Sequence, residues 1–268
     1  MPVFWFALSQ AKEMDLPNAL LIFFILHVLV YPSSNGYNSF MDRDTDSIGG
    51  VKKPLPVEKQ LFYVTVVIDL TALLLSMLIG AKVALGVALY IIASRLYSYR
   101  GVRLKQYPVI GFLTVVLCQG TLVYGIVSMS VHSDVVLRDV YFPALITALL
   151  IGGTYPLTQV YQHEQDRRDG ITTLSYLLGV KGTFIFCGIV LFVALLLLTI
   201  FFISTGQPYS IWVYLIATFP VAVYLSRWFF KVRRNGASAS FENLMKMNYL
   251  AAICSSLAFV AILILNNR

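Results

Sequence analysis

Two clusters of carboxylate and amide side chains stand at the ends of apolar stretches, and their residue types suit a divalent cation. In the first cluster, Asn38, Asp42 and Asp46 follow one another at intervals of i, i+4 and i+8. On a continuing helix these three side chains share one side, whereas Asp42 and Asp44 converge if the backbone unwinds. Either way, several oxygen atoms face one small volume. Mg²⁺ is typically bound in this manner, between one or two carboxylates and the phosphates of a substrate.

The second cluster contains Gln162, Glu164 and Asp166 and ends near a glycine. Taken alone, each cluster could be an ordinary solvated helix end at the membrane boundary. The basic stretch 98–105, which contains Arg103 and Lys105, adds a second observation. A metal-bound diphosphate needs carboxylates on one flank and cationic donors on the other. The combination therefore favours a diphosphate site over two unrelated helix ends.

The two clusters belong to a pattern that occurs twice. Tyr31-Pro32, Tyr37-Asn38 and Asp42-Arg43 recur, with the same spacing, as Tyr155-Pro156, Tyr161-Gln162 and Asp166-Arg167. Parallel repeats are a known way to build helical membrane proteins around a central site. We therefore predict one domain over residues 1–268, with internal repeats at about 18–130 and 140–265.

Long apolar helices must position these clusters. The chain is 58% hydrophobic and only 12% charged, with a mean hydropathy of +0.77, and a soluble domain has about 25% charged residues. Continuous apolar stretches of membrane-spanning length lie near 18–37, 61–80, 83–99, 108–131, 140–160, 183–204, 209–230 and 247–265. The predicted fold is an all-α integral membrane bundle of eight full helices around a central cavity. Residues 2–11 are either the end of a further, truncated helix or an interfacial stub.

The basic residues predict the orientation of this bundle. Alternate connections at 38–59, 95–107, 161–182 and 227–246 carry most of the Lys and Arg residues, and the remainder of the chain has only Lys12, Lys82, Arg138 and Arg268. The positive-inside rule assigns the basic connections, and the acidic clusters beside them, to the cytoplasmic face of a cell membrane. The net charge of +7 is thus explained without a nucleic-acid partner. Asp69, inside an apolar stretch, is predicted to make a buried structural hydrogen bond.

At these residues the chain resembles the UbiA-type superfamily of intramembrane prenyltransferases. The family pattern N-x3-D-x3-D is matched by Asn38, Asp42 and Asp46. Its second pattern, D-x-E-x-D-x3-G-x2-T-L followed by L-G, is matched from Gln162 to Gly179 with Gln162 in place of the first Asp. A Tyr-Ser pair followed by R-L-K is matched by Tyr97-Ser98 and 103–105. The resemblance extends from about residue 18 to the C-terminus.

The resemblance implies transfer of a prenyl group from an allylic polyprenyl diphosphate to an aromatic or other lipophilic acceptor, as in quinone, lipid or pigment biosynthesis, with the donor tail among the helices and membrane lipid around them. It implies Asp42 and Asp166 as catalytic residues. It implies Mg²⁺ as cofactor, with the ligands Asp42, Asp44, Asp46, Glu164 and Asp166. It implies contacts to the substrates from Asn38, Arg43, Tyr97, Arg103, Lys105, Gln162 and Arg167. Tyr37, Tyr97 and Tyr161 are candidates to stabilise an allylic cation.

Two departures from the family pattern keep other functions open. Gln162 replaces a carboxylate, and the first of the family's nine helices is largely absent from this sequence. A non-catalytic protein that binds a prenyl lipid fits both departures. A transporter would also use internal repeats, although its polar residues would be expected near mid-membrane. A phosphoalcohol transferase has little support, because the sequence has no D-G-x2-A-R stretch.

Overall fold

The computed structural model describes residues 1–11, 14–43, 51–52, 54–131 and 137–266 of the chain. Nearly all of this part is helical. The α-helices are α1 (Pro2–Ser9), α2 (Leu16–Phe24), α3 (Tyr31–Asp42), α4 (Lys59–Ile79), α5 (Ala81–Ser98), α6 (Pro108–Val116), α7 (Val123–Val131), α8 (Leu137–Gly152), α9 (His163–Arg168), α10 (Leu174–Ser204), α11 (Pro208–Arg234) and α12 (Phe241–Asn266). Short π and 3-10 segments join some of them: η1 (Ile25–Val30), η2 (Leu104–Gln106), η3 (Leu117–Leu122), η4 (Tyr155–Gln159) and η5 (Gly236–Ser238).

Eight helical stretches of the described chain are long and apolar enough to cross a membrane. They fall where the apolar stretches predicted them, so the predicted all-α integral membrane fold is confirmed. Two of them, 16–42 and 108–131, contain a π-helical segment in the middle, at η1 and η3. A π segment adds a residue to a helical turn and often marks a functional region of a helix.

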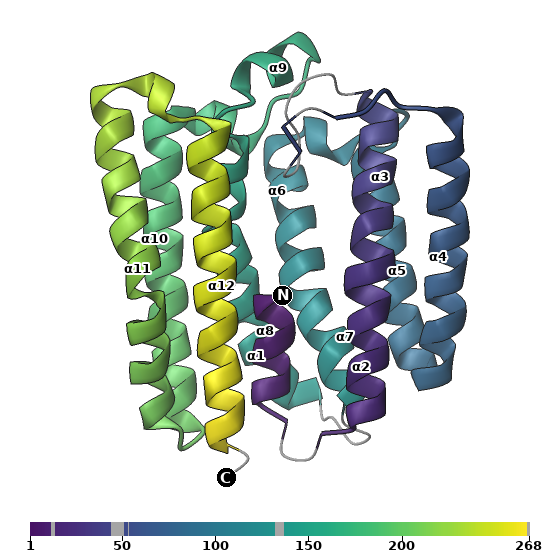
Figure 1. Ribbon diagram of the computed structural model, residues 1–268, viewed down its shortest axis with the longest axis vertical. Coiled ribbons are helices and arrows are strands. Elements are labelled where there is room, and N and C mark those ends of the chain that lie inside the picture. Colours follow the sequence, from purple (N-terminus) through teal and green to yellow (C-terminus); the bar gives the residue numbers. More distant parts are fainter. Residues whose placement is uncertain (12–13, 44–50, 53, 132–136, 267–268) are drawn as a thin grey trace.

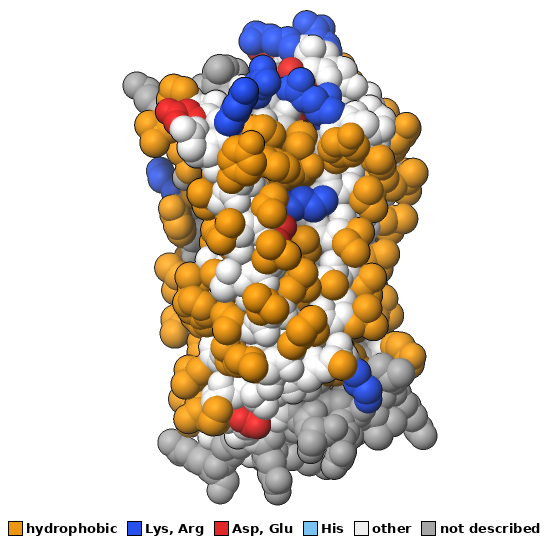
Figure 2. Space-filling model, turned by 90° about the vertical axis from the view of Figure 1, so that its right-hand side faces the viewer, with side chains coloured by type: hydrophobic (Ala, Val, Ile, Leu, Met, Phe, Trp, Pro, Cys, Tyr) orange, Lys and Arg blue, Asp and Glu red, His pale blue; other side chains and the backbone are white. Residues whose placement is uncertain are grey.

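The spanning helices stand side by side in two groups (Figure 1). Helices α3, α4 and α5 lie on one side, α10, α11 and α12 on the other, and α6, α7 and α8 lie between them. Helix α9 and the ends of α3 and α11 lie at one end of the bundle, which we call the polar end. Lys and Arg side chains gather at one end of an otherwise largely apolar face (Figure 2). Both copies of the repeated pattern finish at the polar end, but the duplication itself stays a prediction.

Helix α1 is part of the bundle interior. Of the two alternatives for residues 2–11, a further helix and an interfacial stub, this position favours the helix. It packs against α12 and α7. Phe6 has no exposed surface, and its ring stacks on that of Phe259 with 4.7 Å between centroids. A short stub at the membrane interface would leave this aromatic surface in contact with lipid or water.

Helix α10 begins earlier than the apolar stretch 183–204 predicted. Its first turns, from Leu174, contain Ser175 and Gly179, which lowered the hydropathy of that region. The helix breaks at Gly179, whose φ of +65° and ψ of 167° only glycine adopts readily. The Thr183 hydroxyl donates to the Gly179 carbonyl at 2.8 Å and so satisfies one acceptor that the break exposes.

An ion pair inside the membrane span joins α3, α4 and α5. Arg95 donates from Nε to Asp69 Oδ2 at 2.9 Å, and the Ser33 hydroxyl donates to Asp69 Oδ1 at 2.6 Å. Asp69 therefore has the structural role that the sequence predicted. The sequence predicts Arg95 in the basic connection 95–107, but the structure places it in α5, where Asp69 compensates its charge. Its guanidinium also lies 4.0 Å from the centre of the Tyr37 ring.

Candidate active site

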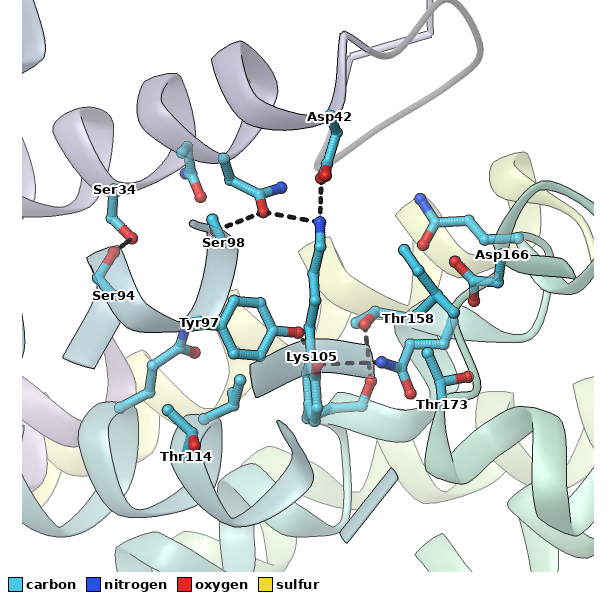
Figure 3. A pocket seen from close by; sticks show the side chains of 18 of the residues that line it. Ser34, Asp42, Ser94, Tyr97, Ser98, Lys105, Thr114, Thr158, Asp166 and Thr173 are labelled. Atoms are coloured by element: carbon cyan, nitrogen blue, oxygen red, sulfur yellow. Dashed lines mark hydrogen bonds and ion pairs between the residues drawn. The ribbon is translucent and has the colours of Figure 1, made fainter. Parts of the chain in front are cut away.

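A polar cavity of about 440 Å³ opens at the polar end, where α3, α5, η2 and the η4–α9 segment converge. Figure 3 shows Lys105 pointing up toward Asp42, with Asp166 to the right of this pair. Both predicted catalytic aspartates line this cavity. The structure therefore brings together two sequence clusters that lie more than a hundred residues apart.

Asp42 is the last residue of α3, and Arg43 ends the helix in the left-handed conformation, with φ of +53°. This position aims the Asp42 carboxylate at two cations from the 103–105 stretch. Lys105 forms an ion pair with Asp42 Oδ2, and Arg103 Nη2 lies 3.4 Å from Asp42 Oδ1. The side chains of Asp42 and Lys105 are only 7% and 9% exposed. This ion pair is therefore largely shielded from water, and its charges interact strongly.

Asn38 lies one helical turn before Asp42 and connects the same elements. Its side-chain oxygen accepts hydrogen bonds from the Ser98 hydroxyl at 2.7 Å and from Lys105 Nζ at 3.2 Å. The i, i+4 spacing therefore places Asn38 and Asp42 on one side of α3, as the sequence predicted. Together they hold Lys105 at the mouth of the cavity.

Asp166, on α9, is the second acidic group of the cavity and forms no ion pair with another described residue. Burial raises the pKa of its carboxyl to about 7, although Lys105 acts in the opposite direction and Asp169 and Asp42 add to the rise. Its Oδ2 atom is buried without a hydrogen-bond partner among the described residues. A buried carboxylate oxygen without a partner is costly, and a cation is the partner that would satisfy it.

A hydrogen-bonded group of side chains lies deeper in the cavity. The hydroxyls of Tyr97 and Tyr155 are 2.5 Å apart, and Gln159 Nε2 donates to the Tyr155 hydroxyl at 3.0 Å. The Gln159 side chain is 8% exposed, and its Oε1 atom has no partner among the described residues. The cavity thus offers a buried hydrogen-bond acceptor as well as its charged groups.

Several predicted site residues do line the cavity: Asn38, Asp42, Tyr97, Lys105, Tyr161, Gln162 and Asp166. Four others do not. Arg103 contacts Asp42 but is not among the residues that line the cavity. Arg43 and Arg167 are exposed at the polar end, and the Glu164 side chain is 91% exposed, with Oε2 4.0 Å from Arg168 Nη2. Their predicted roles in binding metal or substrate stay predictions.

Two further predicted ligands, Asp44 and Asp46, lie outside the described residues. Tyr37, a candidate for stabilising a cation, is buried beneath Arg95 and is not among the residues that line the cavity. Tyr97 and Tyr161 are the candidates of that set that do line it.

The sequence reading missed several residues that line the cavity, notably Asp169, Tyr155, Gln159 and Thr173. Asp169 follows Asp166 by three residues and lies directly after the end of α9. On a continuing helix this spacing would share one face, so the sequence did contain a signal for it. Tyr155 was noted only as part of the repeated Tyr-Pro pair. No sequence pattern pointed to Gln159, because an isolated Gln in an apolar stretch has no distinctive spacing.

The residues present fit a divalent cation held together with a ligand. Within the described part of the chain, no three His, Cys, Asp or Glu side chains come together as a metal-binding group. Mg²⁺ does not need such a group, because it is usually held by one or two carboxylates and by substrate phosphates. Asp42 and Asp166 face the same cavity, and Asp166 has the oxygen atom without a partner.

A second, larger cavity of about 760 Å³ adjoins the polar one and extends among α1, α8, α10, α11 and α12. Its lining is mostly apolar, with Phe6, Ile151, Leu191 and Phe259 among its residues. Five residues line both cavities, so the two spaces meet. A molecule with a charged head and a long apolar tail fits this combination.

The sequence matches the model of the UbiA prenyltransferase family over residues 1–265. The chain belongs to this family. No curated protein matches the sequence. Solved UbiA structures share the fold: the apo structure of a homologue from Aeropyrum pernix K1 matches with a TM-score of 0.72 and 18% identity, over 98% of this chain and 97% of that one.

Two other solved structures give the same picture of the UbiA fold. A homologue from Archaeoglobus fulgidus bound to DMAPP and Mg²⁺ matches with a TM-score of 0.69 and 16% identity, over 97% of this chain and 93% of that one. A structure concerning digeranylgeranylglyceryl phosphate synthase matches with a TM-score of 0.63 and 19% identity, over 99% and 91% of the two chains. The resemblance noted in the sequence is thereby confirmed.

Proposed function

We propose that this UbiA protein catalyses Mg²⁺-dependent transfer of a prenyl group from an allylic polyprenyl diphosphate to an aromatic or other lipophilic acceptor. The observation that carries the proposal is the placement of Asp42, Asp166 and Lys105 around a polar cavity that opens into an apolar one. The homologue structures bound to DMAPP and Mg²⁺ and to GPP and Mg²⁺ support it, since they pair this fold with a prenyl diphosphate and a divalent ion.

Asp42 and Asp166 are the proposed Mg²⁺ ligands in the described part of the chain, with Asp44, Asp46 and Glu164 as further candidates. When bound, Mg²⁺ would act as a Lewis acid that withdraws charge from the diphosphate. Asp42 is paired with Lys105 in this structure. On binding, the diphosphate would replace Asp42 as the partner of Lys105, and the Asp42 carboxylate would be free to hold the metal.

Side chains of this protein would bind the diphosphate and stabilise the allylic cation. Lys105 and Arg103 would donate charge-assisted hydrogen bonds to the diphosphate oxygens, and the Asn38 and Gln162 amides would orient them. The bond between the allylic carbon and its oxygen breaks, and its electron pair leaves with the diphosphate. The nucleophilic atom of the acceptor then bonds to the allylic carbon, and the acceptor loses one proton to water. The ring faces of Tyr97 and Tyr161 would stabilise the developing allylic cation.

We further propose that the polar end faces the cytoplasm, in the inner or plasma membrane of the cell. The support is the concentration of Lys and Arg at connections on this end, which the positive-inside rule assigns to the cytoplasm.

The test is prenyl transfer by membranes that contain the full chain, with labelled allylic diphosphates of several lengths and a panel of lipophilic acceptors, with and without Mg²⁺. The expected result is a Mg²⁺-dependent product that Asp42→Asn and Asp166→Asn each reduce by at least about 100-fold. Asp139→Asn is the matched control, since Asp139 is exposed at the start of α8 and far from the cavity.

A non-catalytic prenyl-lipid binder is the second candidate, favoured by Gln162 in a carboxylate position and by the exposure of Glu164. It predicts Mg²⁺-dependent retention of the labelled diphosphate without product for any acceptor. Neither product nor retention would exclude both candidates.

A further inference from the structure

The five residues that line both cavities share one property. All are uncharged and all can form hydrogen bonds: Ser34, Asn35, Tyr90, Gln119 and Asn248. They come from α3, α5, η3 and α12, and we call them the neutral waist. Any molecule that reaches from the charged mouth into the apolar cavity must pass these side chains.

The neutral waist lies well below the charged mouth. Asn35 precedes Asp42 by seven residues on the same helix, which corresponds to about 10 Å along its axis. If the diphosphate binds at Asp42 and Lys105, the first carbons of the prenyl group extend toward the waist. The waist is therefore where an acceptor would meet the reacting carbon.

Amide groups of the waist and its surroundings are available to a ligand. The side chains of Asn35 and Asn248 make no hydrogen bond with another described residue, although both line the two cavities. Gln159 lines the polar cavity beside them, is 8% exposed, and has an Oε1 atom without a partner among the described residues. Asn35 is exposed and Asn248 is half-buried, so the penalty of about 2–7 kcal/mol for a polar group without a hydrogen bond in apolar surroundings applies to the Gln159 oxygen. These amides gain a partner if they bind a polar ligand.

The charged side chains that line the two cavities determine which class of acceptor can bind. Lys105 is the only cationic side chain among the described residues that line the polar cavity, and it is already paired with Asp42. The apolar cavity has no charged side chain in its described lining. Met1 also lines it, and burial lowers the pKa of its α-amino group to about 6, so this amine is mostly uncharged at neutral pH. A carboxylate or phosphate on the acceptor would lose its water here without gaining a cation, which is strongly unfavourable. A hydroxyl, in contrast, can donate to an amide oxygen such as Gln159 Oε1 and accept from an amide N–H.

We propose that the neutral waist is the acceptor subsite and that the acceptor has an uncharged, hydroxyl-bearing reacting end. This inference rests on the proposed prenyl transfer and specifies its second substrate. The acceptor hydroxyl binds the amides of the waist, and its apolar part shares the larger cavity with the donor tail. Acceptors that carry a carboxylate or phosphate beside the reacting group are excluded.

The test compares two matched probes on the purified full chain in the presence of Mg²⁺ and inorganic diphosphate. One is an alkylated hydroquinone, and the other is the same ring with an added carboxylate. Binding is measured by equilibrium titration, and transfer is measured with a labelled allylic diphosphate. The hydroquinone is expected to bind at least about 100-fold more tightly than the carboxylate probe. Equal or tighter binding of the carboxylate probe, or binding of neither, overturns the proposal.

Variants of the waist locate the binding. Asn35→Leu and Asn248→Leu are each expected to weaken hydroquinone binding about 10-fold while retention of the labelled diphosphate is unchanged. Tyr249→Leu is the control, because Tyr249 is the neighbour of Asn248 on α12 but is 61% exposed on the outer surface. Asn248→Lys, which adds the missing cation, is expected to reverse the preference and favour the carboxylate probe.

The retention and binding measurements distinguish a failure of the proposed prenyl transfer from a failure of the proposed acceptor subsite. Loss of Mg²⁺-dependent diphosphate retention in the unmodified chain contradicts the proposed prenyl transfer. Intact retention together with waist variants that bind the hydroquinone normally contradicts only the acceptor subsite. If Asn35→Leu lowers the amount of folded protein, Asn35→Gln provides a second test, since it keeps the amide and should restore binding.

Discussion

At the scale of single residues, Lys105 is the cation on which the candidate site depends. Its ion pair with Asp42 is almost completely buried, so Lys105→Met leaves this buried carboxylate with only the longer, 3.4 Å contact to Arg103. We expect this change to lower the stability of the metal-free protein by about 3–5 kcal/mol and to weaken diphosphate retention about 10- to 100-fold. Thermal unfolding and retention assays measure the two effects. Lys59→Met, at an exposed position before α4 continues into the membrane, should change neither.

Asp166 gives the site a dependence on pH. Burial raises the pKa of its carboxyl to about 7, and Mg²⁺ binds only the ionised form. As pH falls below about 7, the apparent Mg²⁺ affinity through this group should fall up to about tenfold per pH unit, and above about pH 8 it should level off. The stability of the metal-free protein depends on pH in the opposite direction. The folded state favours the protonated form of Asp166, so the free energy of unfolding decreases as pH rises from about 4 to 7.

Titration calorimetry with Mg²⁺ at a series of pH values checks this behaviour. Asp166→Asn should remove both dependences, because its amide does not titrate. A Mg²⁺ affinity of the unmodified protein that stays constant between about pH 6 and 8 would contradict the assignment of Asp166 as a ligand.

At the scale of elements, close contact between η3 and α8 requires a glycine at position 120. An added Cβ at Gly120 would lie 2.6 Å from the Ala148 Cα atom, so Gly120→Ala must push two helices apart. Small residues allow such close approach in membrane bundles. We expect a loss of about 1–3 kcal/mol. Gly125→Ala is the matched control, since its Cβ would meet only a Val140 side chain at 4.0 Å. Resistance to unfolding by heat or detergent distinguishes the two variants.

The break in α10 supports a second prediction for an element. Gly179 has a backbone conformation that L-residues rarely adopt, with φ of +65°. Gly179→Ala is therefore expected to cost about 1–3 kcal/mol even though space for a Cβ is open. Gly182→Ala, in the helix that follows, should be neutral or slightly stabilising. Equal stability of both variants in an unfolding experiment would show that the break at Gly179 is not required.

At the scale of the whole molecule, the orientation of the bundle can be tested by labelling. Lys59 begins α4 and Arg234 ends α11, and these two helix ends lie at the polar end (Figure 1). Single cysteines at both positions should therefore react with a membrane-impermeant thiol reagent from the cytoplasmic side. Single cysteines at Lys82 and Tyr209 should react only from the other side. The three native cysteines are replaced first. Labelling of Arg234Cys from outside intact cells would contradict the proposed orientation.

Features of the site that lie within one element could be predicted from the sequence, whereas contacts between distant elements could not. The side of α3 that carries Asn38 and Asp42 followed from helix periodicity, and Lys105 was chosen from a basic stretch. Glu164 was expected among the ligands but is exposed, because α9 is a short helix at the bundle surface and spacing alone does not say which of its sides faces inward. The hydrogen bond between Tyr97 and Tyr155 joins distant elements, so no local pattern predicted it.

The fold class, the eight spanning helices, the acidic and basic clusters and the family can be predicted from the sequence, because hydropathy and helix periodicity act over neighbouring residues. Which side chains meet could not be predicted in this way. The pairing of Asp42 with Lys105, the oxygen of Asp166 without a partner and the neutral waist all depend on helix packing. Packing is set by the summed fit of many side chains from distant segments, and no single stretch of sequence contains that information.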